Sequence, residues 1–410
     1  MHTGRPELDV DFVRDQFPAL GEDWAFMDNA GGSVPAAQVV DAVAAYMCQF
    51  GHQLGASYPR SREAGERVMA GKAAIARLFG AAPEEVVLNA STTSNVYVLA
   101  HALGDTLKPG DEVVVTELDH EANVGAWRRL EARGAVVKEW RFDRETCALR
   151  VEDLEPLLGE RTRFVAMTHC PNVTGVFQPV AEAALLVHAA GARLCVDGVA
   201  YAPHRRVDVK ALGADVYLAS LYKVYGPHLG FMYVAPDFLA EVRNQNHFFV
   251  GEDTAYKLEP GNVNHELTAG LSGIERYLAA VWAHHGGSTD TGDWRDRVFD
   301  LFADHEARMA ERILGFLRDH PRVRVIGDAR SDRNLRAPTI AFTVEGRSSE
   351  AIPAALDGRQ IAIRFGDFYA RRAMEGMGLM ERSGVVRISL VHYNSHAEVE
   401  RLLAALDDVL

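Results

Sequence analysis

Apolar runs of strand length alternate with amphipathic stretches through the first two thirds of the chain. A brief apolar strand is expected before the small residues at 30–32, and two stretches with helical spacing of their apolar residues, 36–50 and 62–80, predict helices after it. The apolar runs predict buried strands, which are expected within 86–103, 111–127, 163–176, 192–204 and 215–234. In 86–103 the strand is expected to continue into a helix, and in 111–127 it is expected to end at His120.

The last third of the chain predicts a second, smaller domain. A long amphipathic stretch at 296–319 predicts a helix that leads into it, strands are expected within 322–345, and 348–358 predicts a crossing helix. Residues 359–379 and 384–406 complete this domain. We therefore expect an N-terminal arm at 1–22, a large domain at 23–285 and a small C-terminal domain at 286–410.

Composition and charge narrow the classes of function. With 410 residues, 48% of them hydrophobic and 24% charged, the chain has the composition of an ordinary globular protein. A formal charge of −14 argues against nucleic acid and gives no support for binding to anionic membranes. The N-terminus carries no apolar signal segment and no run reaches the length of a membrane span, so a cytoplasmic protein is expected.

The four cysteines predict neither a metal site nor a disulfide framework. They are scattered without the CxxC spacing of metal ligands, and two of them lie in apolar, strand-like contexts. Buried, reduced thiols are therefore expected. The residues are Cys48, Cys147, Cys170 and Cys195.

Two neighbouring strands are each followed by a residue that carries chemistry. Asp197 ends the apolar run within 192–204, and Lys223 follows the run that begins at 215. Because ligands of open α/β sheets bind outside the carboxyl ends of the strands, both side chains are expected to face one crevice. Pyridoxal phosphate needs this pair: an amine to form a Schiff base with its aldehyde, and an acid to hold the pyridine nitrogen protonated.

At these residues the chain resembles the class V aminotransferase and cysteine desulfurase family, whose hallmark is Asp-Gly followed by a Ser-x-His-Lys segment. The matching residues here are Asp197-Gly198 and Ser220-Leu221-Tyr222-Lys223. The resemblance implies an α/β protein of the pyridoxal-phosphate-dependent transferase fold type I. It further implies a large domain with a mostly parallel seven-stranded sheet, a smaller α+β C-terminal domain, and a homodimer with a shared active site.

Several further residues match positions that bind the cofactor in this family. Hydroxyl groups and free N–H groups at a predicted helix start form an anion site, and the resemblance assigns it to the cofactor phosphate. It also implies that His120 stacks on the pyridine ring, that Asn172 bonds the phenolic oxygen, and that Asn262 reaches the partner subunit's phosphate. His169 is expected to support the turn beside Asn172. The cofactor-binding set is Thr92, Thr93, Ser94, His120, Asn172, Asp197, Ser220, Tyr222, Lys223 and Asn262.

A second set of residues matches the substrate side of the family's site. Arg387 stands where the family has an arginine that clamps the substrate α-carboxylate, for which a planar guanidinium is well suited. Arg364, Ala30 and Tyr369 are expected beside it. For Arg60 and Arg62 two interpretations stay open, contact with an anionic substrate or plain solvation at a helix start.

The chain departs from the desulfurase pattern at the residue that defines that reaction. Tyr369 stands where desulfurases carry the cysteine that forms a persulfide, and a phenol cannot take up sulfane sulfur. Two cofactor positions also differ, since Tyr222 replaces the histidine before the lysine and Ala200 replaces a glutamine. Cysteine desulfuration is therefore not the expected reaction.

The leading hypothesis is a pyridoxal-phosphate enzyme that acts on a small amino acid through an external aldimine and an α-carbanion. Lys223, Asp197 and His120 form the catalytic set, with Lys223 removing the α-proton. The most favoured outcome is β-elimination, as in carbon-sulfur lyases. Transamination and epimerisation share the same carbanion and remain alternatives, and a non-catalytic scaffold with this fold is the alternative from another class.

Overall fold

A computed structural model describes residues 6–21 and 23–410, so part of the arm predicted at 1–22 lies outside the described residues. The centre of the molecule is a seven-stranded sheet in the order β2-β8-β7-β6-β5-β3-β4. Only β8 runs antiparallel to its neighbours, which confirms the mostly parallel sheet. The strands are β2 (Val86–Asn89), β3 (Glu112–Thr116), β4 (Val136–Trp140), β5 (Thr162–Thr168), β6 (Arg193–Asp197), β7 (Val216–Ser220) and β8 (Gly230–Val234).

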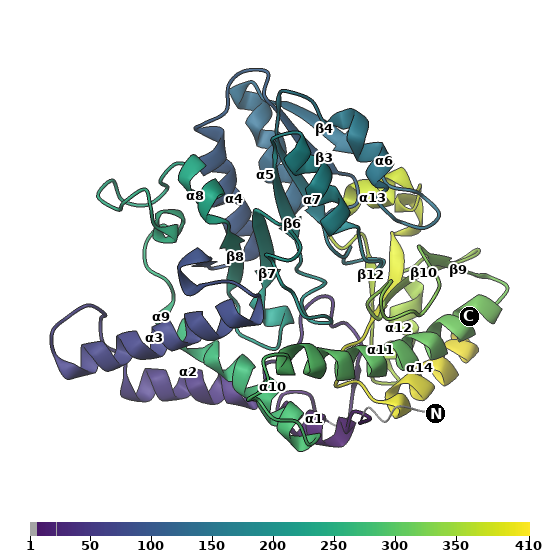
Figure 1. Cartoon of the computed structure of the whole chain (residues 1–410). Coiled ribbons are helices and arrows are strands. Elements are labelled where there is room, and N and C mark those ends of the chain that lie inside the picture. Colours follow the sequence, from purple (N-terminus) through teal and green to yellow (C-terminus); the bar gives the residue numbers. More distant parts are fainter. Residues whose placement is uncertain (1–5, 22) are drawn as a thin grey trace.

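Helices cover both faces of this sheet, so both faces are buried. Successive side chains of a strand point to opposite faces, so neighbouring residues pack against different helices. Val113 and Val115 pack on one side against α4 (Thr92–Gly104), α5 (Ala122–Arg128) and α8 (Pro236–Glu241). Val114 faces the other side, which is covered by α3 (Pro59–Leu78), α7 (Val180–Ala189) and α10 (Ser272–His284). The helices α2 (Ala37–Gln49), α3, α9 (His265–Gly270) and α10 pack together on this second side (Figure 1). The short helix α6 is Val151–Leu154.

The C-terminal part forms a four-stranded antiparallel sheet in the order β12-β13-β10-β9. Its core lies between this sheet and the helices α11, α12 and α14. This C-terminal part, coloured green to yellow in Figure 1, lies beside the large sheet. The four strands of this sheet are β9 (Val323–Ile326), β10 (Thr339–Val344), β12 (Arg364–Gly366) and β13 (Val385–Ser389); β11 (Ile361–Ala362) belongs to a separate two-stranded sheet. The helices are α11 (Trp294–Asp319), α12 (Ala351–Asp357), α13 (Arg371–Gly376) and α14 (His396–Val409).

A strand from the beginning of the chain packs with this C-terminal part. β1 (Ala25–Phe26) pairs in parallel with β11, and the side chains of Ala25 and Met27 lie in the core of the smaller sheet. Residues directly after β1 are thereby held at the junction of the two sheets. The domain boundaries expected from the sequence remain a prediction, since the pairing links residues on both sides of them.

The described part of the N-terminal arm is tied to the body of the protein. Asp9 caps the short helix α1 (Val10–Asp15) by accepting a hydrogen bond from the backbone N–H of Phe12 at 3.1 Å. Phe17 then inserts among the rings of Tyr225, Tyr277 and Tyr393. Tyr225 lies in the turn after Lys223, Tyr277 lies on α10, and Tyr393 follows β13, so the arm contacts both parts.

Among the described residues, no helix is long and apolar enough to cross a membrane. The same residues hold no cluster of three or more potential metal ligands. All four cysteines are free thiols, as expected. Three of them are buried, but Cys48 is exposed, so the expectation of burial was wrong for that residue.

Candidate active site

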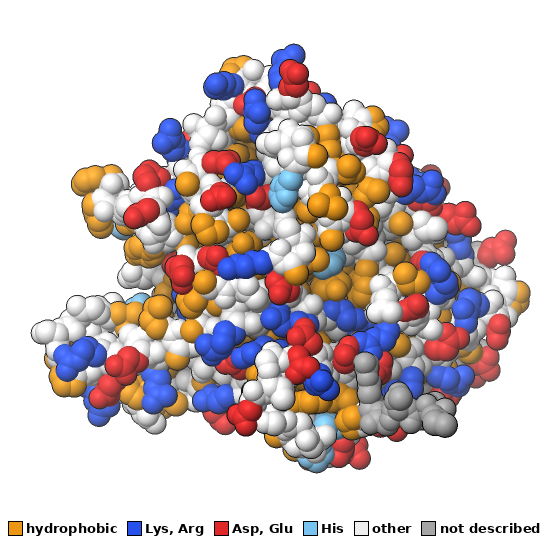
Figure 2. Space-filling view, in the orientation of Figure 1, with side chains coloured by type: hydrophobic (Ala, Val, Ile, Leu, Met, Phe, Trp, Pro, Cys, Tyr) orange, Lys and Arg blue, Asp and Glu red, His pale blue; other side chains and the backbone are white. Residues whose placement is uncertain are grey.

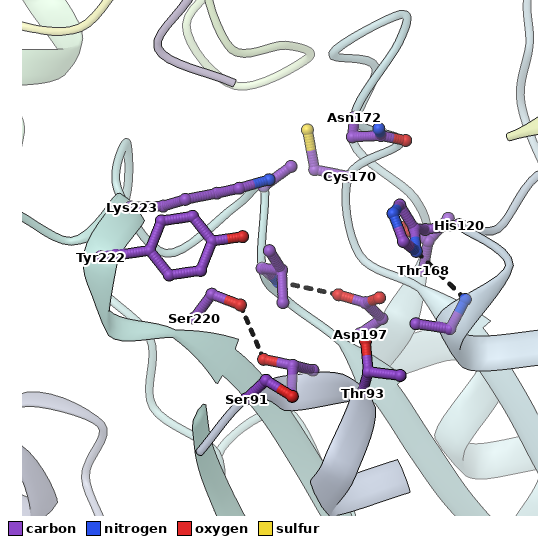
Figure 3. Close-up of a pocket in the computed structure, with 14 residues that line it drawn as sticks. Ser91, Thr93, His120, Thr168, Cys170, Asn172, Asp197, Ser220, Tyr222 and Lys223 are labelled. Atoms are coloured by element: carbon purple, nitrogen blue, oxygen red, sulfur yellow. Dashed lines mark hydrogen bonds between the residues drawn. The ribbon is translucent and has the colours of Figure 1, made fainter. Parts of the chain in front are cut away.

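A pocket opens at the carboxyl ends of the parallel strands, between β2, β3, β5, β6 and β7 (Figure 3). Its volume is about 550 Å³, including space open to solvent, which suits a small organic ligand. Three of these strands, β5, β6 and β7, end in a hydrogen-bonding residue that lines the pocket: Thr168, Asp197 and Ser220. The lining residues are Ser91, Thr92, Thr93, His120, Ala122, Thr168, Cys170, Asn172, Asp197, Val199, Ala200, Ser220, Tyr222 and Lys223.

Asp197 is the last residue of β6 and lies almost wholly buried at the floor of this pocket. Its Oδ1 accepts a hydrogen bond from the backbone N–H of Val199 at 2.9 Å, which fixes the carboxylate. Glycine is required at 198, because a Cβ there would lie 2.0 Å from the hydroxyl oxygen of Tyr217. Burial raises the pKa of Asp197, and the Val199 N–H and the charge of Lys223 oppose that rise.

Lys223 ends a single 3-10 turn that follows β7, and its side chain is also buried. Desolvation lowers the pKa of its amine to about 8, with a further contribution from the positive charge of Arg387. Asp197 and Asp28 act in the opposite direction. A neutral amine is therefore accessible near physiological pH, which is the form that acts as nucleophile or base.

The start of helix α4 forms one wall of the pocket. Ser91 is the N-cap and shares a capping box with Ser94, whose hydroxyl is used within that box and does not line the pocket. Thr92 and Thr93 do line it, beside first-turn N–H groups that a helix leaves free for an anion. Gly230 of β8 allows this approach, since a Cβ there would lie 2.2 Å from the carbonyl carbon of Ser91.

His120 lies four residues beyond the end of β3, so the prediction that the strand ends at His120 was wrong. The chain turns after Thr116, and hydrogen bonds to the buried carboxylate of Asp119 stabilise this turn. Asp119 accepts hydrogen bonds from the Thr116 hydroxyl, the Thr168 N–H and the Asn123 amide. Burial and the charge of Asp197 raise the pKa of Asp119 to about 7. The turn aims the ring of His120 into the pocket.

The imidazole of His120 is kept neutral, because burial and the nearby Lys223 lower its pKa to about 4. A neutral ring can lie flat on a protonated heterocycle without charge repulsion. His169, by contrast, is turned away from the pocket lining and stacks on Tyr201 with 3.5 Å between the ring centroids. Its Nδ1 lies 2.9 Å from the Tyr217 hydroxyl, which agrees with the expected role in supporting the turn.

Asn172 and Cys170 come from the turn after β5. The Nδ2 of Asn172 donates to the backbone oxygen of Phe368 at 2.9 Å, and its Oδ1 is buried without a partner. An unpaired buried acceptor of this kind calls for a donor from a ligand. Burial raises the pKa of the Cys170 thiol to about 12, so this sulfur stays protonated.

Arg387, on β13, lies behind the lining residues and is 1% exposed. Its Nη2 donates to Asp28 Oδ1 at 2.8 Å, and its Nη1 donates to the backbone oxygen of Asn172 at 3.0 Å. Arg364 pairs with Arg387 in the β12–β13 register and reaches the other oxygen of Asp28 at 3.5 Å. Burial lowers the pKa of Arg387, whereas the Asp28 carboxylate supports its charge.

The other predicted substrate-side residues lie around this group. The N–H of Ala30 donates to the Ser389 hydroxyl at 2.9 Å. Tyr369 is 72% exposed, and its ring centroid lies 5.3 Å from that of His120. Neither residue lines the pocket itself, so their contact with substrate stays a prediction.

Three predicted residues lie away from the pocket. Asn262 lines a separate cavity with Lys72 and Glu259. Arg60 pairs with Glu63 on the exposed start of α3, and Arg62 bonds the backbone of Ser57. For both arginines solvation is the interpretation that this placement favours.

Some lining residues were not predicted. Thr168 and Cys170 flank the end of β5, and the register pairs Thr168 with Asp197, so the end of that strand was the available signal. Ser91 opens the hydroxyl run that begins the predicted phosphate site. Ala122 and Val199 have no hydrogen-bonding side chain and gave no signal. Ala200 also lines the pocket, at the position where the resemblance to the family implied a replaced glutamine.

The residues present fit pyridoxal phosphate. The α4 start offers N–H groups and hydroxyls for a phosphate, Asp197 offers a buried acid for a pyridine nitrogen, and Lys223 offers a largely neutral amine for an aldehyde. The unpaired Oδ1 of Asn172 is a further acceptor that a ligand could bond through a donor group.

The fold and this pocket define a pyridoxal-phosphate-dependent enzyme of fold type I. The chain belongs to the aminotransferase class-V family, whose sequence profile matches residues 25–402. Members of this family use pyridoxal phosphate and act on amino acids. The non-catalytic scaffold considered from the sequence is therefore not supported.

Individual relatives cover almost the whole chain. It is 38% identical to an aminotransferase-like protein of Gibberella zeae, over 98% of both chains. It is 32% identical to a cysteine desulfurase-like protein of Aspergillus flavus, over 98% of this chain and 91% of that one. A cysteine desulfurase of Cronobacter sakazakii is 30% identical over 96% of each chain.

A solved structure agrees in fold. The apo form of a cysteine desulfurase from Thermococcus onnurineus superposes with a TM-score of 0.86 over 99% of both chains, at 24% identity.

Proposed function

We propose that this chain binds pyridoxal phosphate through Lys223 and catalyses β-elimination on a small amino acid. The observation that carries the proposal is a buried amine with a pKa of about 8 that shares one pocket with a buried carboxylate. When bound, the cofactor supplies an electron sink for the charge that develops at the substrate α-carbon.

The chain's own residues divide the work of this reaction. Lys223 removes the α-proton, since its lowered pKa leaves a usable neutral fraction near pH 7. Asp197, fixed by the Val199 N–H, holds a proton on the ring nitrogen. His120, a neutral imidazole, would cover the ring of the bound cofactor. Arg387 binds the substrate α-carboxylate, for which its guanidinium has the matching geometry.

Elimination is preferred to desulfuration because no suitable thiolate is available. Tyr369 stands at the place of the desulfurase cysteine. The thiol that lines the pocket, Cys170, stays protonated because its pKa is raised to about 12. Transamination and epimerisation begin with the same proton removal and are the alternatives that product analysis separates.

The reaction type is tested by incubating the holoenzyme with L-cysteine and other small amino acids that carry a β-leaving group. We expect pyruvate together with the released β-substituent, identified by mass spectrometry. Intact-protein mass should show no protein-bound persulfide. A ring-amine form of the cofactor would instead identify an aminotransferase, racemised substrate an epimerase, and a stoichiometric persulfide would overturn the assigned role of Tyr369.

We also propose that two copies of the chain associate and share the active site. Phe248 and Phe249, in the loop after α8, are 96% and 73% exposed, and hydrophobic side chains gather on this projecting loop in Figure 2. Such exposed rings favour an interface. Asn262, which follows in the same segment, lies outside this chain's own pocket and is free to serve the partner's.

Replacing both rings, Phe248→Ser with Phe249→Ser, is expected to weaken self-association by about 30-fold or more, since one buried interface aromatic contributes on the order of 2 kcal/mol. Analytical ultracentrifugation over a range of concentrations measures the change. Leu185→Ser, at a 74% exposed residue of α7, is the control and should leave association unchanged. Unaltered association of the double variant would contradict the proposed interface.

A further inference from the structure

Two consecutive residues beside the site hold a backbone conformation that side chains disfavour. In the loop between β12 and α13, Phe368 has φ 51° and Tyr369 has φ 60°. A left-handed conformation is unfavourable for a non-glycine residue, and such strain persists only where surrounding contacts hold it. The contacts made by this loop therefore indicate which residues the strained conformation positions.

The loop is tied to three segments of the site. The backbone oxygen of Phe368 accepts a hydrogen bond from Asn172 Nδ2 at 2.9 Å. The backbone oxygen of Tyr369 accepts one from the N–H of Glu121, the residue after His120, at 2.7 Å. The ring of Phe368 covers the guanidinium of Arg387, with 3.8 Å between the ring centroid and Cζ.

The Phe368 ring supplies a restraint on Arg387 that the hydrogen bonds leave out. Nη1 and Nη2 are held by Asn172 and Asp28, but Nε is buried without a partner among the described residues. In-plane hydrogen bonds fix the position of a guanidinium, while a stacked ring fixes its plane. Phe368 is itself 9% exposed, so the ring also keeps water from that face.

We propose that Phe368 is a positioning residue for carboxylate recognition by Arg387. Its ring sets the plane of the guanidinium, and therefore the plane in which the unpaired Nε–H can meet a substrate carboxylate. Its backbone oxygen also fixes the amide of Asn172. The inference rests on the proposed function, in which Arg387 binds the substrate α-carboxylate. Paired N–H···O bonds to a carboxylate need coplanar groups, so a tilted guanidinium binds weakly.

The test compares binding of L-alanine and L-alaninamide to the holoenzyme by isothermal titration calorimetry. Phe368→Leu is expected to raise the Kd of L-alanine about 10-fold, because a desolvated cation–π contact contributes roughly 1–2 kcal/mol. The Kd of the amide, which lacks the carboxylate, should change less than 2-fold, as roughly expected of a contact it does not use. Phe368→Tyr keeps the ring and should bind as the parent does.

Phe142→Leu is the matched control, because Phe142 is also buried and also stacks with an arginine, Arg144, at 4.1 Å. It should lower the melting temperature without changing the Kd of L-alanine. Arg387→Lys separates the two levels of the proposal. If Arg387→Lys leaves L-alanine binding unchanged, or the parent protein does not bind it, the proposed carboxylate site is wrong. If Arg387→Lys weakens binding and Phe368→Leu does not, Phe368 has no positioning role.

Discussion

Lys223→Ala is expected to lower kcat for the amino-acid substrate by about 10⁴-fold, the upper range for loss of a positioned general base. The same change should remove the visible absorbance of lysine-bound pyridoxal phosphate, because Lys223 is the one lysine that lines the pocket in the described part of the chain. Lys223→Arg keeps the charge but provides no reactive amine, and it should be equally inactive. Absorbance spectra and steady-state kinetics of the purified proteins measure both effects.

The comparison with an unrelated lysine gives the control. Lys210 pairs with Glu85 at 3.0 Å on the surface, so Lys210→Ala should keep both the absorbance and kcat. Full visible absorbance in Lys223→Ala would mean that another amine holds the cofactor, and the assignment of Lys223 would then be wrong.

The lowered pKa of Lys223 also predicts how the apoprotein takes up pyridoxal phosphate at different pH values. Only the neutral amine attacks an aldehyde, so uptake should become faster as pH rises and should level off above about 8. Near pH 7 about a tenth of the amine is neutral, and uptake should be roughly 10-fold slower than at the plateau. Stopped-flow absorbance follows the reaction, and a midpoint near the ordinary lysine pKa would contradict the effect of burial.

The second large effect is expected for Asp197→Asn, which should lower kcat by about 10²–10³-fold through loss of a preorganised charge. Asparagine has the same shape and can still accept the Val199 N–H, so the fold should persist. It cannot hold a proton on the ring nitrogen, and the absorbance of the bound cofactor should shift as a result. Spectra and kcat of the variant test these two outcomes together.

Asp215→Asn provides the matched control, because Asp215 is a similarly buried aspartate at the opposite ends of the strands from the pocket. It binds His188 and Arg193 and lies near the start of β7, far along the strand from the pocket. Its loss should lower the melting temperature and leave kcat and the cofactor spectrum unchanged. An Asp197→Asn enzyme with normal kcat would refute the role given to this carboxylate.

Much of the large domain could be predicted from local pattern. The runs that end at Asp197 and Ser220 are strands with those residues at their carboxyl ends, because a continuous apolar run fits only a strand buried on both faces. The hydroxyl run after Asn89 begins a helix at Thr92 for an equally local reason, since Ser91 and Ser94 form a capping box.

Other features had no local signal. The turn at Thr116 depends on the carboxylate of Asp119 meeting the N–H of Thr168, a residue of another strand. The pairing of β1 with β11 joins segments more than 300 residues apart, and the pattern of apolar residues does not predict which strands pair. The cover that Phe368 places over Arg387 likewise depends on two segments meeting in space.

The sequence by itself determined the class of chemistry, because an acid and an amine at the ends of adjacent apolar runs reach one crevice in any parallel sheet of this kind. Only the tertiary structure decided the state of those groups. The pKa of Lys223, the neutral ring of His120 and the occupied donors of Arg387 all depend on burial and on neighbours distant in sequence. Desolvation and charge act through space, so the folded arrangement sets them.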